Sequence, residues 1–244
     1  MKRVYMFDVD GTLTPARTLM LKEHEEQFME WAPGKRIYLV SGSDMKKIKE
    51  QLPREVIESC AGIYTSMANC YYENGGVRYS KLYMPSSDLI EDLEGIVEST
   101  EYEDLAGDHI EYREGMINFS VVGRAATMEQ REAYAQWDAT KKDREAIVEV
   151  LSKYHPHLDF VIGGKISIDI FPRGYDKSQA PKHRREEDSD AEIVFFGDRT
   201  EYPGNDYAIV AELDRTKEEE GLPSRWHAVE SPEDTFKILR DLYS

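Results

Sequence analysis

The sequence predicts an α/β fold in which helices cover a parallel sheet. An inserted α+β segment divides this fold into two parts of the chain. Strand and helix signals alternate over residues 1–66 and again after Asp176, which is typical of parallel sheets with helical crossovers. Between these parts the strand signals come in neighbouring pairs, which indicates antiparallel hairpins. We therefore expect a discontinuous core domain at residues 1–82 and 177–244, with the insert at residues 83–176.

The core begins with the apolar run Val4–Phe7, which predicts a buried strand. A helix should follow Asp176, its expected N-cap, and Pro181 should shorten or kink that helix. The acidic stretches 186–190 and 217–220 are expected in solvated loops or helix ends. Further core helices are expected at residues 18–31, 44–52, 206–212 and 232–242, and further core strands at residues 35–40, 62–66, 193–196 and 226–229.

The middle of the chain shows a different pattern. A hairpin is expected from Tyr71 to Tyr83, around the turn Asn74-Gly75-Gly76. The later elements should be helices at residues 86–99 and 128–154, the second interrupted near Asp138, and strands at residues 109–113, 116–122, 159–162 and 165–171. Because these strands are adjacent hairpin pairs, they predict an antiparallel sheet with helices on one side.

The composition limits the classes of function. A net charge of −17 on 244 residues disfavours nucleic acid and anionic membranes as partners, and it repels phosphorylated substrates at long range. An enzyme that acts on phosphates would therefore need a local concentration of Arg and Lys. No apolar run approaches the roughly 20 residues of a membrane span, and the early first strand leaves no room for a signal peptide. With only Cys60 and Cys70, we expect buried, reduced thiols in a cytoplasmic protein.

Two carboxylates stand directly after the first strand, in the sequence Asp8-Val9-Asp10-Gly11-Thr12. The carboxyl edge of an open α/β sheet is where such folds place their ligands. Two carboxylates so close repel each other unless a cation lies between them, and hard oxygen ligands favour Mg²⁺. The alternative is an Asx-turn that simply closes the strand.

The stretch Phe7–Ala16 resembles the nucleophile motif of the haloacid dehalogenase-like (HAD) superfamily. The resemblance implies a Rossmann-like HAD core and a type IIB-like cap as the insert. It makes Asp8 the nucleophile that becomes an aspartyl phosphate, and Asp10 the general acid/base. Members with Asp at the second position are typically phosphatases and phosphomutases.

Two further segments fit a phosphotransferase. The strand that ends in Ser41-Gly42-Ser43 offers a hydroxyl and backbone N–H groups that could hold the phosphoryl oxygens. The superfamily expects Ser or Thr here: Ser41 fits by position, Ser43 is the alternative, and Ser43 could also be a helix N-cap. Lys177 resembles the superfamily lysine that pairs with the nucleophile and the phosphoryl group, although most lysines are surface residues.

A second apolar strand ends in an acidic residue, Asp198. The resemblance makes Asp198 a Mg²⁺ ligand supported by Asn205 and Asp206, together with Asp8 and the backbone carbonyl of Asp10. An acid-rich turn without a metal is the alternative. Mg²⁺ commonly keeps several waters and uses few carboxylates, which suits this set.

The insert contains the basic residues that the net charge demands. The stretches Glu111–Arg124 and Gly163–Pro172 resemble two cap signatures of the eukaryotic-type phosphomannomutase family, and the resemblance extends over nearly the whole chain. Arg131 follows at a matching interval, and Arg17 matches an arginine that family members direct at the substrate.

These residues suggest a binding site for a sugar phosphate. Arg113, Arg124 and Arg131 could clamp the distal, non-reacting phosphate by bidentate contacts, with surface salt bridges as the alternative for each. Strand alternation places Asn118 on a polar face, and Ser167 and Asp169 share a face likewise. These three side chains could hydrogen-bond sugar hydroxyls.

The leading hypothesis is a Mg²⁺-dependent phosphohexomutase that interconverts mannose 6-phosphate and mannose 1-phosphate. A hexose 1,6-bisphosphate would be activator and intermediate, and a closing cap would exclude water. Glucose phosphates could also be accepted. The alternatives are a HAD-type sugar-phosphate phosphatase and a catalytically silent interaction protein. The resemblance also implies a homodimer formed through the cap.

Overall fold

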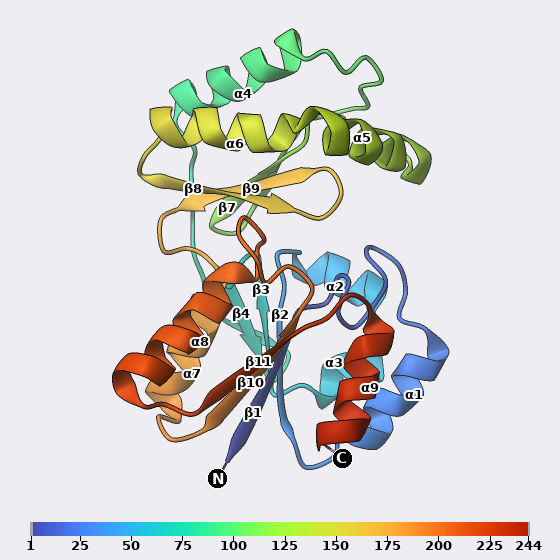
Figure 1. The fold of residues 1–244 in the computed structure, drawn as a ribbon, viewed down its shortest axis with the longest axis vertical. Helices are drawn as coiled ribbons and strands as arrows, with labels where there is room; N and C mark the ends of the chain where they lie inside the picture. Colours follow the sequence, from blue (N-terminus) through green and yellow to red (C-terminus); the bar gives the residue numbers. More distant parts are fainter. Residues whose placement is uncertain (1, 244) are drawn as a thin grey trace. The chain divides into compact units, whose positions relative to one another are not determined.

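The computed structural model describes residues 2–243 and divides them into two compact units (Figure 1). The core unit contains the chain up to Ser80 and again from Asp176, and the cap unit is Lys81–Tyr175. These bounds lie one or two residues from those expected from the sequence.

A seven-stranded sheet forms the centre of the core unit. Its strands are β1 (Arg3–Phe7), β2 (Arg36–Val40), β3 (Gly62–Thr65), β4 (Cys70–Glu73), β5 (Gly76–Ser80), β10 (Glu192–Gly197) and β11 (Ser224–Ala228). In the order β11-β10-β1-β2-β3-β4-β5, the first five strands are parallel, and β4 and β5 add an antiparallel hairpin. This topology confirms the predicted α/β class.

Helices cover both faces of this sheet (Figure 1). They are α1 (Lys22–Trp31), α2 (Met45–Gln51), α3 (Arg54–Ser59), α7 (Gln179–Glu187), α8 (Tyr207–Glu220) and α9 (Pro232–Tyr243). In β1, Tyr5 and Phe7 pack in the apolar cluster of α1, α2, α3 and α9, whereas Val4 and Met6 pack in the cluster of α7 and α8. The first strand is thus buried on both faces, which explains its continuous apolar run.

Helix α1 begins at Lys22 and not at Thr18, so the predicted start was wrong. The preceding segment is held by a tertiary contact, because the Met20 N–H donates to the Gln51 carbonyl at 2.8 Å. Leu21 is extended, with φ −65° and ψ 142°. Helix α3 has no counterpart among the predicted elements.

Helix α8 runs to Glu220, past the predicted end at Glu212, so the acidic run 217–220 forms a helix end, one of its two expected settings. Arg215 forms ion pairs of 2.8–3.0 Å with Glu212, Glu219 and Glu220, which neutralise part of that run along the helix. Gly221, at φ +69°, then ends the helix.

Helix α7 begins at Gln179, later than expected. The Asp176 carboxylate accepts a 2.7 Å hydrogen bond from the Ser178 N–H, so it closes the turn before the helix and is not the N-cap itself. Pro181 lies in the first helical turn, where its missing N–H leaves no intrahelical bond unmade.

The cap unit contains a four-stranded antiparallel sheet in the order β6-β7-β9-β8. Its elements are α4 (Ser87–Ser99), β6 (Ile110–Arg113), β7 (Met116–Phe119), α5 (Met128–Lys141), α6 (Asp143–Tyr154), β8 (Leu158–Gly163) and β9 (Ser167–Pro172). The helix break lies at Lys142, at φ +59°, and not near Asp138. Asp138 instead accepts from the Arg144 N–H and its Nε, which ties the start of α6 to α5.

The two faces of the cap sheet differ in character. Ile117, Phe119, Ile168 and Ile170 belong to one apolar cluster that includes side chains of α4, α5 and α6, and Figure 1 shows these helices on the same side of the sheet. Because side chains alternate along a strand, Asn118 and Asp169 lie on the other face of the sheet.

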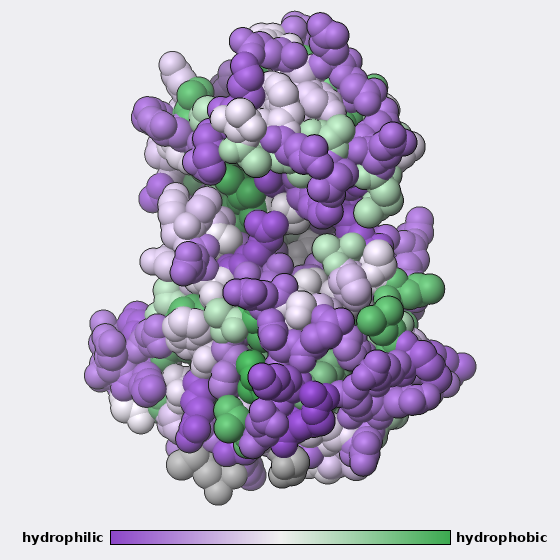
Figure 2. Space-filling model, turned by 45° about the vertical axis from the view of Figure 1, so that its right-hand side comes forward, coloured by the Kyte–Doolittle hydropathy of each residue, from purple (hydrophilic) through white to green (hydrophobic). Residues whose placement is uncertain are grey.

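Hydrophilic side chains dominate the face of the molecule in Figure 2, with apolar residues in small scattered groups. Among residues 2–243, no helix combines the length and the apolar character that a bilayer span requires. Cys60 and Cys70 are free thiols, and burial raises the pKa of Cys60 to about 12.

Candidate active site

Three neighbouring parallel strands end in polar residues at one edge of the core sheet. Phe7 pairs with Phe196 of β10 and with Leu39 of β2, so the three strands end within one residue of one another. Asp8 therefore lies between Asp198, which follows β10, and Ser41, which follows β2. The register explains why residues so distant in sequence form one site.

Asp8 is joined to a buried lysine. The Nζ of Lys177 lies 2.7 Å from Asp8 Oδ1 and 2.7 Å from Asp206 Oδ1, and all three side chains are almost fully buried. Burial opposes the charge of Lys177, but Asp206 and Asp8 outweigh it and raise the pKa of the ammonium group. Lys177 is therefore a fixed cation against Asp8, and not a surface residue.

The three carboxylates of Asp8, Asp198 and Asp206 each offer an oxygen within 4.8 Å of the others. Burial raises the pKa of Asp8, and although Lys177 opposes this, the neighbouring carboxylates add to it. Burial and then Asp206 raise the pKa of Asp198 to about 7. Lys177 thus offsets only part of the negative charge of the three carboxylates.

Asn205 and Gly11 complete this part of the site. The Oδ1 of Asn205 is buried and has no hydrogen-bond partner among the described residues. A Cβ at Gly11, at φ +82°, would lie 2.7 Å from the Asp198 Cγ, so the close approach of the turn requires glycine. All-oxygen donors around excess negative charge fit a hard divalent cation such as Mg²⁺.

Asp10 is held by a set of donors different from those at Asp8. Its Oδ1 accepts from the Arg17 N–H at 2.6 Å and from Gln51 Nε2 at 2.8 Å, and its Oδ2 lies 3.4 Å from Ser43 Oγ. Arg17 has a left-handed φ of +61°, which turns its N–H toward the carboxylate. Sequence reasoning missed Gln51, since nothing marks a glutamine in a lysine-rich helix as part of a site.

Ser41 and Ser43 form the third side of this edge. The Ser43 N–H donates to Ser41 Oγ at 3.0 Å, and Ser41 is buried. Asp44, and not Ser43, is the N-cap of α2, accepting from the Lys47 N–H at 2.7 Å. Ser43 is therefore directed at Asp10.

The cap unit brings the remaining predicted residues into one polar cluster, which begins on the polar face of its sheet. Glu111, Asn118 and Asp169 are consecutive partners across β6, β7 and β9. Glu111 pairs with Arg113 at 2.8 Å and with Arg124. Burial opposes the Glu111 charge, but the two guanidinium groups lower its pKa to about 2. Glu111 was not predicted as part of this cluster.

The same cluster extends to Arg131, Ser167 and Asp169. Arg124 Nη1 donates to Ser167 Oγ at 3.1 Å, and Asn118 Nδ2 donates to Asp169 Oδ1 at 2.5 Å. Arg131 Nε donates to the Ala126 carbonyl, but its buried Nη1 has no hydrogen-bond partner among residues 2–243. Burial and the nearby Arg124 lower the pKa of Arg131. This cluster has more guanidinium groups than carboxylates, so it suits an anion.

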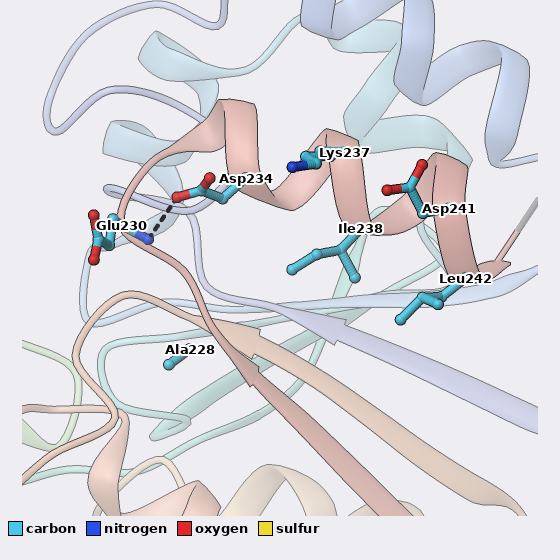
Figure 3. Close-up of a pocket in the computed structure, with 7 residues that line it drawn as sticks. All are labelled: Ala228, Glu230, Asp234, Lys237, Ile238, Asp241 and Leu242. Atoms are coloured by element: carbon cyan, nitrogen blue, oxygen red, sulfur yellow. Dashed lines mark hydrogen bonds between the residues drawn. The ribbon is translucent and has the colours of Figure 1, made fainter.

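A separate cavity of about 560 Å³ lies between α9 and the end of β11 (Figure 3). It contains none of the predicted site residues. Its carboxylates outnumber its one ammonium group, which disfavours a phosphorylated ligand. The lining residues are Ala228, Glu230, Asp234, Lys237, Ile238, Asp241 and Leu242.

The parallel sheet, the acidic edge and the inserted antiparallel cap define a protein of the HAD fold. The C-terminal domain of trehalose-6-phosphate phosphatase from C. albicans has a TM-score of 0.63 at 14% identity, over 98% of this chain and 90% of that one. A HAD subclass IIB sugar phosphatase has a TM-score of 0.58 at 12% identity, over 98% of both chains.

Within this class, the chain belongs to the eukaryotic phosphomannomutase family, whose profile matches residues 25–244. It is 35% identical to the phosphomannomutase of Saccharomyces cerevisiae, over 98% of this chain and 93% of the relative. It is 34% identical to that of Spinacia oleracea, over 98% and 95%. The family predicted from the motifs is confirmed.

Proposed function

We propose that this protein is a phosphomannomutase that interconverts mannose 6-phosphate and mannose 1-phosphate. Membership of the family supports an enzyme of the mutase kind. The observation that carries the proposal is the buried Asp8, at the same sheet edge as Asp198 and Ser41 and 2.7 Å from a fixed lysine. A carboxylate so placed can act as a phosphoryl acceptor.

In the proposed reaction, a carboxylate oxygen of Asp8 attacks a phosphorus atom of a hexose 1,6-bisphosphate. The bond from phosphorus to the sugar oxygen breaks, and Asp10 gives its proton to that oxygen. A hydroxyl of a hexose monophosphate then attacks the aspartyl phosphate while Asp10 takes the hydroxyl proton. Asp8 is regenerated, and the phosphoryl group is now on the hydroxyl that attacked, so the monophosphate has become a hexose 1,6-bisphosphate.

The core residues have distinct parts in this scheme. Lys177 neutralises charge on Asp8 and on the phosphoryl oxygens, and Ser41 or Ser43 donates to those oxygens. We propose Mg²⁺ as the cofactor, held by Asp8, Asp198, Asn205, Asp206 and the Asp10 carbonyl. When bound, it supplies positive charge against the phosphoryl group. The buried, unpartnered Asn205 Oδ1 and the three close carboxylates support this assignment.

The cap cluster would bind the phosphate that does not react. Arg113, Arg124 and Arg131 supply the charge, while Asn118, Ser167 and Asp169 would contact sugar hydroxyls. The buried Nη1 of Arg131 and Oδ1 of Asn118, which lack hydrogen-bond partners in the described chain, support a polar ligand here. We assign Arg17 to substrate binding as well, since its backbone is fixed against Asp10.

We further propose that the enzyme is cytoplasmic and forms a homodimer through the cap. The free thiols favour a reducing compartment. A groove of about 350 Å³ among α4, α5 and α6 exposes apolar side chains such as Val150 and Trp137, which a second copy could cover.

The direct test is to trap the phosphoenzyme. The protein is incubated with Mg²⁺ and glucose 1,6-bisphosphate carrying labelled phosphorus, quenched in acid and mapped by mass spectrometry. We expect label at Asp8 that hydroxylamine releases, and none in Asp8→Asn. Label elsewhere, or equal label in both proteins, would overturn the proposal.

A further inference from the structure

We propose that Gln51 is a positioning residue for the general acid/base: it fixes one oxygen of Asp10, so that the other carries the exchanged proton. This inference rests on the proposed function, because it assigns a role to an atom of Asp10 in that reaction. Gln51 is the last residue of α2 and is 1% exposed.

The hydrogen bonds of Asp10 distinguish its two oxygens. Oδ1 accepts from Gln51 Nε2 at 2.8 Å and from the Arg17 N–H at 2.6 Å. An oxygen that accepts two such bonds is a poor place for a proton, because the proton would point at another donor. Oδ2 accepts one long hydrogen bond, from Ser43 Oγ at 3.4 Å, and because that hydroxyl can turn to accept instead, Oδ2 is left to carry the proton.

Gln51 is itself held firmly in place. Its backbone carbonyl accepts from the Met20 N–H at 2.8 Å, and Nε2 also lies 3.3 Å from Thr14 Oγ1. The side chain therefore joins α2 to the turn that carries Asp10. The NH₂ end of the amide must face Asp10, because an ionised carboxylate can only accept hydrogen bonds.

The other end of the amide argues against a purely structural role. The Oε1 of Gln51 is buried and has no hydrogen-bond partner in the part of the chain that the structure describes. A buried unpaired acceptor is unfavourable, and an apolar side chain of the same length would avoid it. The glutamine is explained by what its N–H does for Asp10, and not by packing.

The consequence is specific to steps that need a proton. When a sugar oxygen leaves phosphorus, it must receive the proton from Asp10 Oδ2. When acetyl phosphate is the donor, the departing acetate is stable without a proton. Loss of Gln51 should therefore slow transfer from a sugar phosphate and spare transfer from acetyl phosphate.

The test compares the rate of Asp8 phosphorylation by the two donors in rapid-quench experiments with Mg²⁺. For Gln51→Met we expect about 10–100-fold slower labelling from glucose 1,6-bisphosphate, and a rate within about twofold of wild type from acetyl phosphate. Gln51→Leu also removes the N–H donor without adding a charge, so it should show the same selectivity. Gln27→Met, which alters a half-buried glutamine of α1, is the control and should leave both rates unchanged.

An equal loss with both donors, in either Gln51 variant, would mean a structural role and would overturn the inference. So would unchanged rates with both donors. If the wild-type protein is labelled by neither donor, the proposed function fails instead, which separates the two outcomes.

Discussion

Asp198→Asn should stabilise the metal-free protein at neutral pH, although it alters a residue of the acidic edge. Burial and then Asp206 raise the pKa of Asp198 from the ordinary 3.8 to about 7. The folded protein therefore binds this proton more tightly than the unfolded chain does. The stability that the proton provides is present below about pH 4 and is lost as the pH rises to about 7.

The size of the effect follows from the shift. About three pH units, at about 1.4 kcal/mol each, give an upper limit of about 4 kcal/mol. Because the side chain is 24% exposed, solvent screens part of this effect. We therefore expect the free energy of unfolding of Asp198→Asn to exceed that of wild type by about 2–4 kcal/mol at pH 8. Asparagine is neutral at every pH, so the variant should avoid this loss.

The assay is urea unfolding in EDTA, from about pH 4 to pH 8, for wild type and Asp198→Asn. The curves should agree near pH 4 and separate steadily, with the variant more stable at pH 8. Saturating Mg²⁺ should reverse the order, because wild type would gain binding energy that the variant loses. A variant less stable than wild type at pH 8 in EDTA, or a difference independent of pH, would refute this reasoning.

Three further predictions concern other parts of the molecule. Lys177→Met should lower the free energy of unfolding by about 3–5 kcal/mol at pH 7, because it leaves buried carboxylates without their cation; a loss below about 1 kcal/mol in urea unfolding would contradict this. Arg131→Met should raise the KM for mannose 1-phosphate at least tenfold, because it removes a charged donor worth about 1.5–3 kcal/mol. Labelling of Asp8 by acetyl phosphate should stay normal, and an unchanged KM would mean that Arg131 does not bind the substrate. Val150→Glu in the groove of the cap should give monomers in sedimentation velocity, whereas the exposed Met128→Glu, outside that groove, should not; equal dimer content in both would refute a dimer through this face.

The parts of the site that depend on local pattern could be predicted from the sequence. A buried apolar strand followed by two carboxylates places Asp8 at a sheet edge, and a second such strand does the same for Asp198. Parallel register then brings the two together, which needs no knowledge of side-chain contacts.

Contacts across long separations could not be predicted from pattern. Lys177 lies 169 residues from Asp8, and its position came only from resemblance to a family. Gln51 and Glu111 gave no signal, because their roles depend on neighbours set by the tertiary fold. The late start of α1 has the same origin, since the Met20 N–H bonds to Gln51, 31 residues further along the chain.

The central claim is that phosphoryl groups pass through Asp8 to another sugar hydroxyl and not to water. The most direct measurement follows mannose 1-phosphate with Mg²⁺ and a catalytic amount of glucose 1,6-bisphosphate, quantifying mannose 6-phosphate and free phosphate separately, with Asp8→Asn as control. We predict mannose 6-phosphate without matching free phosphate in wild type, and neither product in the variant. Free phosphate alone, abolished in Asp8→Asn, would contradict the account and identify a phosphatase.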